Sequence, residues 1–412
     1  MPRAYTPSST RPLSIHVLWH PETGDGPELA RAVYRWFRGD ERRLDEVGKG
    51  VPVFYRWQPA SAEQPAPRPI HCQGDELCVV VPLIDEHMVI DPVWRRYLLE
   101  QIDRPGVHVY PAALHPSAFN MPGRFSRLNY LRLEQREDPS TWSWQEHQRA
   151  RTERLLGQLT QAISRLLLAR PRGRDGTDPG PAVRVFISHA KQDGTAIARQ
   201  LREALLNYGQ LEVFFDESEL AFGYEFERAL EDSARVAGQT AAMIVVYSDA
   251  YPTRPWCVRE LRLAQTPRRM GETSPHDRVW RRKPMLVLDA LEQTRTRFLP
   301  ELGNAPVLRW DPGRARLIID TLMREVLLYT FNELRALAQA NDGTALHINC
   351  VPDLYALACI QRELDAGATR PGDAIDLRCP PPGPSNQERE HLAGLVPRIR
   401  VRALNEPEPG GG

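Results

Sequence analysis

Short apolar runs alternate with amphipathic stretches along the first part of the chain. Residues 13–19 (LSIHVLW) predict a buried strand, and residues 26–37 carry apolar side chains at helical spacing. The alternation continues with strand-like runs at 51–57, 76–83 and 106–114, a helix over 93–102 and a long helix over roughly 142–170. Alternating strands and helices predict a parallel sheet with helices on both faces.

A second alternation begins after a break. Residues 171–182 (PRGRDGTDPGPA) are rich in Gly, Pro and Asp and predict a linker. Asp193 is a candidate N-cap for the first helix after it, and a polar, basic excursion over 266–283, which includes Trp280, predicts an exposed loop. The strands expected in this part are 183–190, 211–217, 240–248, 284–290 and 305–310, with a long helix over about 312–340.

The last part of the chain holds about half a domain. Its strand-like segments are ALHINC, AIDLRC and RIRVRAL, and its helix-like segment is DLYALACIQREL. We expect residues 341–412 either to extend one of the two sheets or to form a small α/β cap. The tail NEPEPGGG is too polar to pack and is expected to be disordered.

The composition narrows the class of partner. The 53 basic and 53 acidic side chains balance, which argues against nucleic acid or an anionic membrane as a general partner. Neither a secretory signal nor a run of about 20 apolar residues is visible, so we expect a cytoplasmic protein. The 6 cysteines show no CxxC pair, so we expect free thiols in a reducing compartment and no metal site.

Four segments of the second part resemble a known family. VFISHAKQD (185–193), VFFDESELAFG (213–223), AAMIVVYSDAY (241–251) and WCVREL (256–261) are similar, in order and spacing, to the strands, loops and helix motif of a TIR (Toll/interleukin-1 receptor) domain. The resemblance implies a flavodoxin-like sheet of parallel strands. With the similar strand–helix order of the first unit, it predicts an α/β fold: two flavodoxin-like (TIR-like) parallel-sheet units plus a small C-terminal α/β segment.

The predicted domains follow from this resemblance. Residues 1–170 form a degenerate TIR-like domain for sensing or assembly, residues 171–182 a linker, residues 183–340 the TIR domain and residues 341–412 a C-terminal α/β extension with a disordered tail.

The motif in the fourth segment is similar to that of bacterial TIR domains that cleave NAD. This likeness implies cleavage of the nicotinamide–ribose bond, with NAD as substrate and no cofactor. Loss of nicotinamide builds positive charge on the ribose C1′, which the Glu260 carboxylate suits. Trp256, four residues earlier, lies on the same side of a helix and is assigned to substrate binding, since it could stack on an aromatic ring or wall the pocket. Cys257, Leu261 and Ala264 would form the buried stripe beside Glu260.

The resemblance also assigns substrate-binding positions. Ser188 and His189 end the first strand of this unit, Asp216 ends the second, and Phe222 and Gly223 close the next loop. Ligands of open α/β sheets bind at the carboxyl ends of the strands. These residues would therefore line the NAD site.

Simpler interpretations of the same residues stay open at this point. Glu260 could pair with Arg254 or Arg259 on a solvated face, and Trp256 could belong to a core. The chain would then be a non-enzymatic adaptor that binds other TIR domains. The first hypothesis is an NAD hydrolase, possibly cyclising, that acts in bacterial antiviral defence or signalling. It self-associates through other TIR domains, and the loop 216–223 becomes ordered on assembly.

The first unit offers an internal comparison. Its third strand is followed by VWRRYLLE, in which Leu98 stands four residues after Trp94, where the second unit has Glu260. Glu100 is displaced by two positions and would point elsewhere. The first unit is therefore predicted to lack the catalytic carboxylate and to bind an activating ligand or protein instead.

Overall fold

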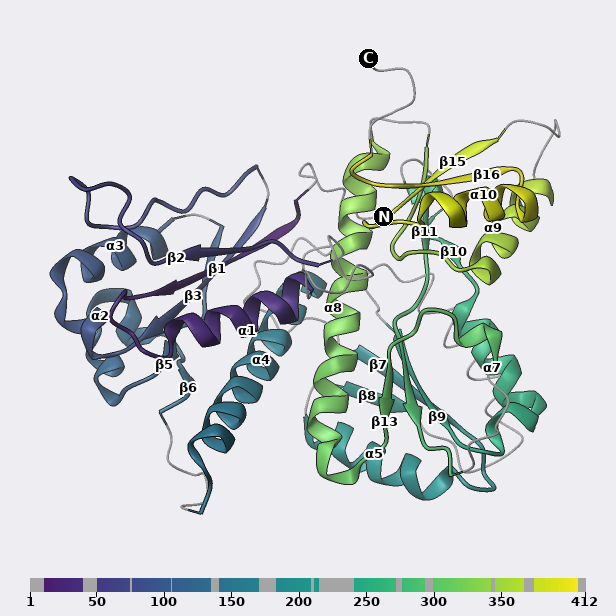
Figure 1. Ribbon diagram of the computed structural model, residues 1–412, viewed down its shortest axis with the longest axis horizontal. Helices are drawn as coiled ribbons and strands as arrows, with labels where there is room; N and C mark the ends of the chain where they lie inside the picture. The colour runs from purple at the N-terminus through teal and green to yellow at the C-terminus, as the bar shows by residue number, and fades with distance from the viewer. Residues whose placement is uncertain are drawn as a thin grey trace. The chain divides into compact units, whose positions relative to one another are not determined.

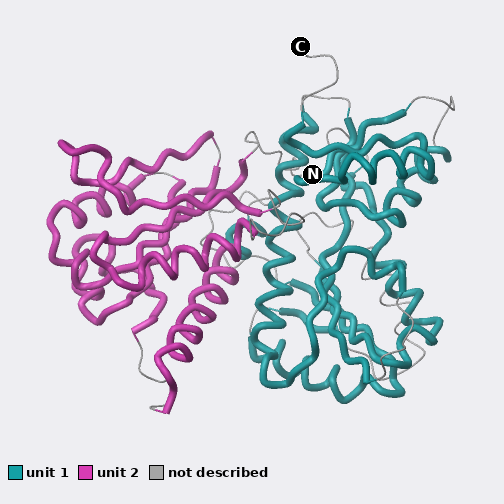
Figure 2. The backbone as a smooth tube through the Cα atoms, viewed as in Figure 1, with its two compact units in different colours: residues 1–6, 164–412 teal, residues 7–163 magenta. Residues whose placement is uncertain are grey.

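The computed structural model divides the chain into two compact units, shown in Figure 2: residues 7–163, and residues 1–6 with 164–412. The predicted linker 171–182 and the loop 216–223 lie outside the described residues. The structure describes residues 11–39, 50–74, 76–104, 106–134, 141–169, 183–208, 211–214, 241–271, 276–292, 299–341, 345–366 and 374–406.

The unit of residues 7–163 is built on a sheet of order β2-β1-β3-β5-β6 (Figure 1). Strand β4 also pairs with β3. Every strand pair described in it is parallel. The strands are β1 (Leu13–Trp19), β2 (Val53–Arg56), β3 (Leu77–Ile84), β4 (Val107–Val109), β5 (Ala112–Ala113) and β6 (Leu131–Arg132). All of β1 and nearly all of β3 are buried, as their continuous apolar runs predict.

Helices and short 3₁₀ turns connect these strands, and a long helix, α4, follows the last of them. They are α1 (Gly26–Arg38), α2 (Glu86–Ile90), α3 (Pro92–Ile102), α4 (Trp144–Ala169) and the turns η1 (Pro116–Asn120) and η2 (Gly123–Arg127). Both Trp94 and Leu98 of α3 belong to the hydrophobic core, whereas Glu100 is exposed. Residues 57–74, between β2 and β3, form no helix or strand.

The second sheet has the order β13-β12-β9-β7-β8, and all its described pairs are parallel. This is the flavodoxin-like order that the sequence predicts. Its strands are β7 (Val183–His189), β8 (Leu211–Phe214), β9 (Ala241–Tyr247), β12 (Met285–Asp289) and β13 (Val307–Arg309). Apolar residues of α5 (Thr195–Tyr208) and α8 (Ala315–Ala340) join one hydrophobic core, and those of α7 (Pro255–Gln265) join another. The two cores cover the two faces of the sheet.

A third sheet corrects the expectation of an exposed basic loop over 266–283. Its order is β10-β11-β14-β15-β16, with β10 antiparallel to β11 and the other pairs parallel. Trp280 of β11 is fully buried in a core with Ile348 and Leu377. The excursion therefore supplies two strands to a sheet that the C-terminal segment completes. Its elements are β10 (Arg268–Arg269), η5 (His276–Arg278), β11 (Val279–Arg281), β14 (Leu346–Ile348), α9 (Leu354–Ala366), β15 (Ile375–Cys379), α10 (Asn386–Leu395) and β16 (Ile399–Ala403).

Helix α8 packs against both of these sheets. Ile318 and Leu322 of its first half join the core of the second sheet. Ala336 and Leu337 of its second half pack with Val279 of the third sheet. The predicted domain boundary at residue 340 stays a prediction, but the strands on either side of it share one helix (Figure 1). The short turns before α8 are η6 (Pro300–Leu302) and η7 (Pro312–Arg314).

Two expectations from the sequence need correction or restriction. The prediction of six free thiols is wrong for Cys72 and Cys78, which form a disulfide. The free thiols are those of Cys257, Cys350, Cys359 and Cys379. The predicted disordered tail 405–412 lies outside the described residues beyond Glu406, and Glu406 itself accepts a hydrogen bond from Arg389.

Within the described ranges, no helix is long and apolar enough to cross a membrane.

Candidate active site

The candidate site lies where the connections of the second sheet change direction. Strands β7 and β9 are neighbours, with β8 on the far side of β7 and β12 on the far side of β9. Ligands of open α/β sheets bind at the carboxyl ends of the two strands at such a point. Ser188 and His189 end β7 there, and the turn η4 (Tyr251–Thr253) leads from β9 into α7.

A chain of hydroxyl groups links this edge of the sheet to Glu260. The Ser188 Oγ donates a hydrogen bond of 2.6 Å to the Glu260 Oε2, and it lies 2.9 Å from the Tyr251 Oη. Because the serine hydroxyl has one proton, donation to Glu260 leaves it to accept from Tyr251. The Tyr251 hydroxyl also lies 3.3 Å from the carbonyl oxygen of Cys257. The Ser188–Glu260 distance is in the short range of charge-assisted hydrogen bonds.

Two neighbours of the carboxylate keep their protons. Burial, followed by the nearby Cys257, raises the pKa of Tyr251 well above its usual value, and Glu260 adds to this. Burial, followed by the charge of Glu260, raises the pKa of Cys257 to about 12. Both groups are neutral near pH 7, so they act as hydrogen-bond donors and not as nucleophiles or bases.

The helix α7 presents its residues as the sequence predicts. Cys257, Leu261 and Ala264 are buried, and Glu260 lies half-buried on the flank of this stripe. The core alternative for Trp256 is wrong, because this side chain is 57% exposed. Exposure leaves an indole face available for a ligand or a protein.

The arginines considered as partners of Glu260 also have other contacts. The Arg259 guanidinium lies over the Trp256 ring, 5.4 Å from its centroid. Arg254 donates a hydrogen bond to the side chain of Gln192.

Asp193 has a role that the sequence analysis missed. Its Oδ1 accepts a hydrogen bond of 2.5 Å from the Ser248 hydroxyl, and its Oδ2 accepts one of 2.8 Å from the backbone N–H of Ala250. These bonds tie the loop after β7 to the loop after β9. Asp193 thus fixes the two segments that carry Ser188 and Tyr251.

The comparison with protein families covers this part of the chain. A family model described as TIR domain matches residues 185–276. The chain contains a TIR domain. The match runs from β7 to η5 and includes both Ser188 and Glu260. Strands β12 and β13, beyond it, complete the same sheet.

The other comparisons add no argument about function. The search of the curated proteins finds no match. Among solved structures, a crystal structure of a mutation variant of SsGBP is 10% identical in sequence and covers 76% of this chain and 95% of that chain. Its TM-score is 0.19, so the likeness carries no weight for the fold.

The remaining predicted site residues of the TIR domain are placed only in part. His189 is partly buried, and its carbonyl oxygen lies 3.5 Å from the Cys257 sulfur. Asp216, Phe222 and Gly223 lie outside the described residues. The substrate-binding roles of these four residues and of Trp256 stay predictions.

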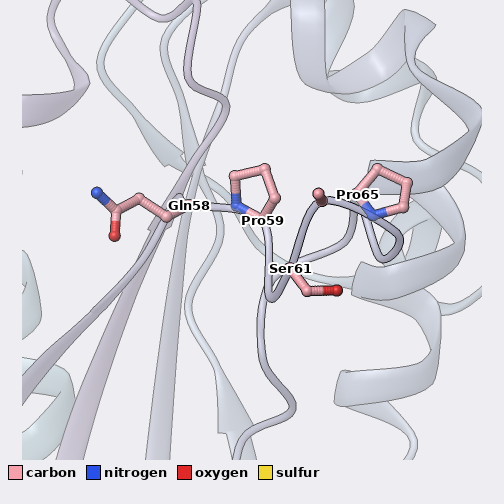
Figure 3. A pocket seen from close by; sticks show the side chains of 5 residues that line it. Gln58, Pro59, Ser61 and Pro65 are labelled. Carbon is pink, nitrogen blue, oxygen red and sulfur yellow. The ribbon is translucent and has the colours of Figure 1, made fainter.

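A surface pocket lies elsewhere, in the loop after β2. It is lined by Gln58, Pro59, Ser61, Ala62 and Pro65 (Figure 3). This lining offers amide, hydroxyl and proline groups but no carboxylate. The candidate site therefore stays at Glu260.

Proposed function

We propose that the TIR domain cleaves NAD at the bond between nicotinamide and ribose, with Glu260 as its catalytic residue. The observation that carries this proposal is the 2.6 Å hydrogen bond from Ser188 to Glu260 at the switch point of the sheet. A solvated glutamate has many conformations, whereas this carboxylate is oriented by a buried hydroxyl. Orientation before reaction is what electrostatic catalysis requires.

The chemistry asks little more of the protein. The C1′–N bond breaks, nicotinamide leaves as a neutral base with the bonding electron pair, and the ribose becomes an oxocarbenium-like cation. The Glu260 carboxylate stabilises this charge or holds the ribose hydroxyls. Attack of water on C1′ then gives ADP-ribose and a proton. Attack by a ring nitrogen of the same molecule's adenine gives a cyclic isomer instead.

The biological setting follows from the family resemblance. We propose a bacterial, cytoplasmic effector of antiviral defence or signalling, which is active when several chains self-associate. TIR domains commonly bind one another, and the contact would use the loop 216–223. The N-terminal unit would receive the activating ligand or protein.

A second candidate function is a non-enzymatic TIR adaptor. The observation that favours it is the exposed Trp256 with the Arg259 guanidinium over its ring. Tryptophan and arginine are common hot-spot residues of protein interfaces, where they contribute much of the binding free energy. In this alternative α7 binds another TIR domain and Glu260 only supports the helix.

The test is release of nicotinamide from NAD by the full chain, with and without fusion to a dimerising domain. We expect Glu260→Gln to lower turnover about 10²–10³-fold, the loss typical of one electrostatic group in an active site. Glu203→Gln, an exposed carboxylate on α5, is the matched control and should keep full activity. Turnover that survives Glu260→Gln contradicts the catalytic assignment. Self-association without any nicotinamide release supports the adaptor.

A further inference from the structure

The N-terminal unit has a switch point of its own. Strands β1 and β3 are neighbours, with β2 on the far side of β1 and β5 on the far side of β3. His20 follows the end of β1 directly, and Asp85 follows the end of β3 and precedes α2. This is the edge at which an α/β sheet binds ligands.

Three potential metal ligands meet at this edge. One ligand atom each of His20, Glu22 and His87 lies within 4.8 Å of the other two. The His87 Nδ1 is 3.1 Å from the Glu22 Oε2, and the His20 and His87 rings stack with centroids 5.7 Å apart. His20 is nearly buried, whereas Glu22 and His87 are accessible to solvent.

The surrounding hydrogen bonds hold these groups in place. The Thr23 hydroxyl donates to the Asp85 Oδ2 at 2.7 Å, which joins the loop after β1 to the loop after β3. Asp85 also caps α2 by accepting from the Met88 N–H. The loop after β1 and the start of α2, which carry the three residues, are therefore fixed to one another, as a binding site requires.

The contacts of His20 select one form of its ring. Its Nε2 lies 3.4 Å from the Asp91 Oδ2, and its Nδ1 accepts a hydrogen bond of 3.2 Å from the backbone N–H of Glu22. A neutral imidazole has one N–H, so the proton belongs on Nε2, where Asp91 can accept it. The Nδ1 lone pair accepts the Glu22 N–H in this structure, so a metal ion bound at Nδ1 would take the place of that hydrogen bond. A carboxylate behind a metal-binding histidine is a common supporting arrangement.

Asp91 is itself fixed by the fold. Its Oδ1 accepts hydrogen bonds from the backbone N–H groups of Val93 and Trp94 at the start of α3. The Oδ2 is left to face His20. Asp91 is therefore a positioning residue for the ring and not one of the three clustered ligands.

We propose that His20, Glu22 and His87 bind one divalent metal ion of the zinc class. Two imidazoles and a carboxylate are a donor set of zinc sites that keep an open fourth position. In a tetrahedral site with ligand bonds of about 2.1 Å, neighbouring donor atoms lie about 3.4 Å apart. The Glu22–His87 separation of 3.1 Å is already close to that value. The exposed fourth position would hold water or a ligand of the N-terminal unit.

The expectation of no metal site came from the spacing of residues along the chain. His20 and Glu22 are close in sequence, but His87 is supplied by a different strand–helix connection. Only the parallel pairing of β1 with β3 brings them together.

The experiment uses the full chain after removal of any affinity tag and of bound metal by a chelator. Zn²⁺ is titrated by competition with a chromophoric chelator, and Co²⁺ is added as a spectroscopic probe. We expect one tight Zn²⁺ per chain, with affinity at least about 100-fold weaker in His87→Ala and in Glu22→Gln. We expect Asp91→Asn, which preserves the helix cap, to keep one site and to weaken it about 10–100-fold.

The control is His115→Ala, an exposed histidine after β5 that lies outside the cluster. It should bind Zn²⁺ as the wild type does, and circular dichroism should show that every variant is folded. Wild-type protein that takes up no stoichiometric Zn²⁺ overturns the proposal. Unchanged affinity in both His87→Ala and Glu22→Gln overturns it too, as does a thiolate-to-cobalt charge-transfer band, which would place the metal on cysteine.

Discussion

The contact between Ser188 and Glu260 can be measured as a free energy. Ser188 is 3% exposed, and its hydroxyl donates to the Glu260 carboxylate at 2.6 Å. The perturbation is a double-mutant cycle of Ser188→Ala and Glu260→Ala. The cycle isolates the pairwise energy, because the cavity and helix-propensity effects of each single change cancel.

The expected magnitude follows from the geometry. A hydrogen bond to a charged group contributes about 1.5–3 kcal/mol. Because Glu260 is half-buried, water can donate to its carboxylate once the serine hydroxyl is removed. We therefore expect a coupling energy at the low end of this range, about 1.5 kcal/mol. The Tyr251 hydroxyl keeps a second acceptor, the carbonyl oxygen of Cys257, at 3.3 Å. Loss of the hydrogen bond between Tyr251 and Ser188 therefore adds little to the free-energy change of Ser188→Ala.

The assay is native-state hydrogen exchange on peptides from β7 and α7. It reports the local free energy of opening and does not require the whole chain to unfold in one step. The control cycle pairs Ser248→Ala with Glu260→Ala, since the buried Ser248 donates to a different carboxylate, that of Asp193. Additivity within about 0.5 kcal/mol in the control and a larger coupling in the Ser188 cycle are expected. Additivity in both cycles would refute the reasoning.

Three further changes test the packing and the titration of the fold. Asp353→Ala removes the carboxylate that lies 2.8 Å from the Arg282 guanidinium, a side chain only 4% exposed. Because a buried charge is then left unpaired, we expect the free energy of unfolding, measured in urea, to fall by about 3–5 kcal/mol. A fall of less than about 1 kcal/mol would mean that water reaches Arg282. Gly303→Ala adds a Cβ 2.1 Å from the Asp353 Oδ2 at a φ of +54°; we expect a loss of about 1–3 kcal/mol by thermal unfolding, and an unchanged midpoint would contradict this close approach. Burial, together with two nearby arginines, lowers the pKa of His16 from 6.5 to about 3 in the folded chain. As the pH drops, the histidine of the unfolded chain is therefore protonated before that of the folded chain. The free energy of unfolding then falls as the pH drops from about 6.5 towards 3. His16→Gln should remove about 3 kcal/mol of the loss between pH 7 and pH 4 in urea unfolding, and equal losses in both proteins would show that His16 does not titrate in this way.

Local pattern predicts the elements whose partners are close in sequence. The residues of α7 are those expected, because Pro255 favours the first turn and the apolar positions form one stripe. Strand β1 has the expected bounds, since a continuous apolar run fits a strand buried on both faces. Helix α10 was missed, although Ser385 and Glu388 form a capping box that is visible in the sequence.

The third sheet could not be predicted in this way. Strands β10 and β11 are short and rich in arginine, so their polarity indicates a solvated loop. Their burial depends on a partner strand, residues 346–348, that lies far along the chain. Trp280 is buried beneath the Arg269 guanidinium, 5.0 Å from its ring. A guanidinium that covers an aromatic ring while facing water makes a polar sequence compatible with a packed strand.

The same limit applies to the candidate active site. Glu260 is found from its motif, but Tyr251 and Asp193 act through bonds between loops that follow different strands. A tyrosine after a strand has no pattern that marks it as a donor to Ser188. Side chains that act across a sheet edge become recognisable only when the order of the strands is known.

The two flavodoxin-like sheets show how one topology supports different chemistry. In both, a helix between the third and fourth strands carries a tryptophan, α3 in the first unit and α7 in the second, but Trp94 is buried against the core and Trp256 is exposed. Four residues later the first unit has the buried Leu98 and the second has the half-buried Glu260. At this place in the sequence pattern the first unit therefore has an apolar side chain and the TIR domain has a carboxylate. In the N-terminal unit, imidazole and carboxylate groups gather instead after β1 and β3, where His20 and Glu22 follow β1 and His87 lies in α2. The metal site proposed for this unit would therefore take its ligands from two connections of the sheet and not from α3.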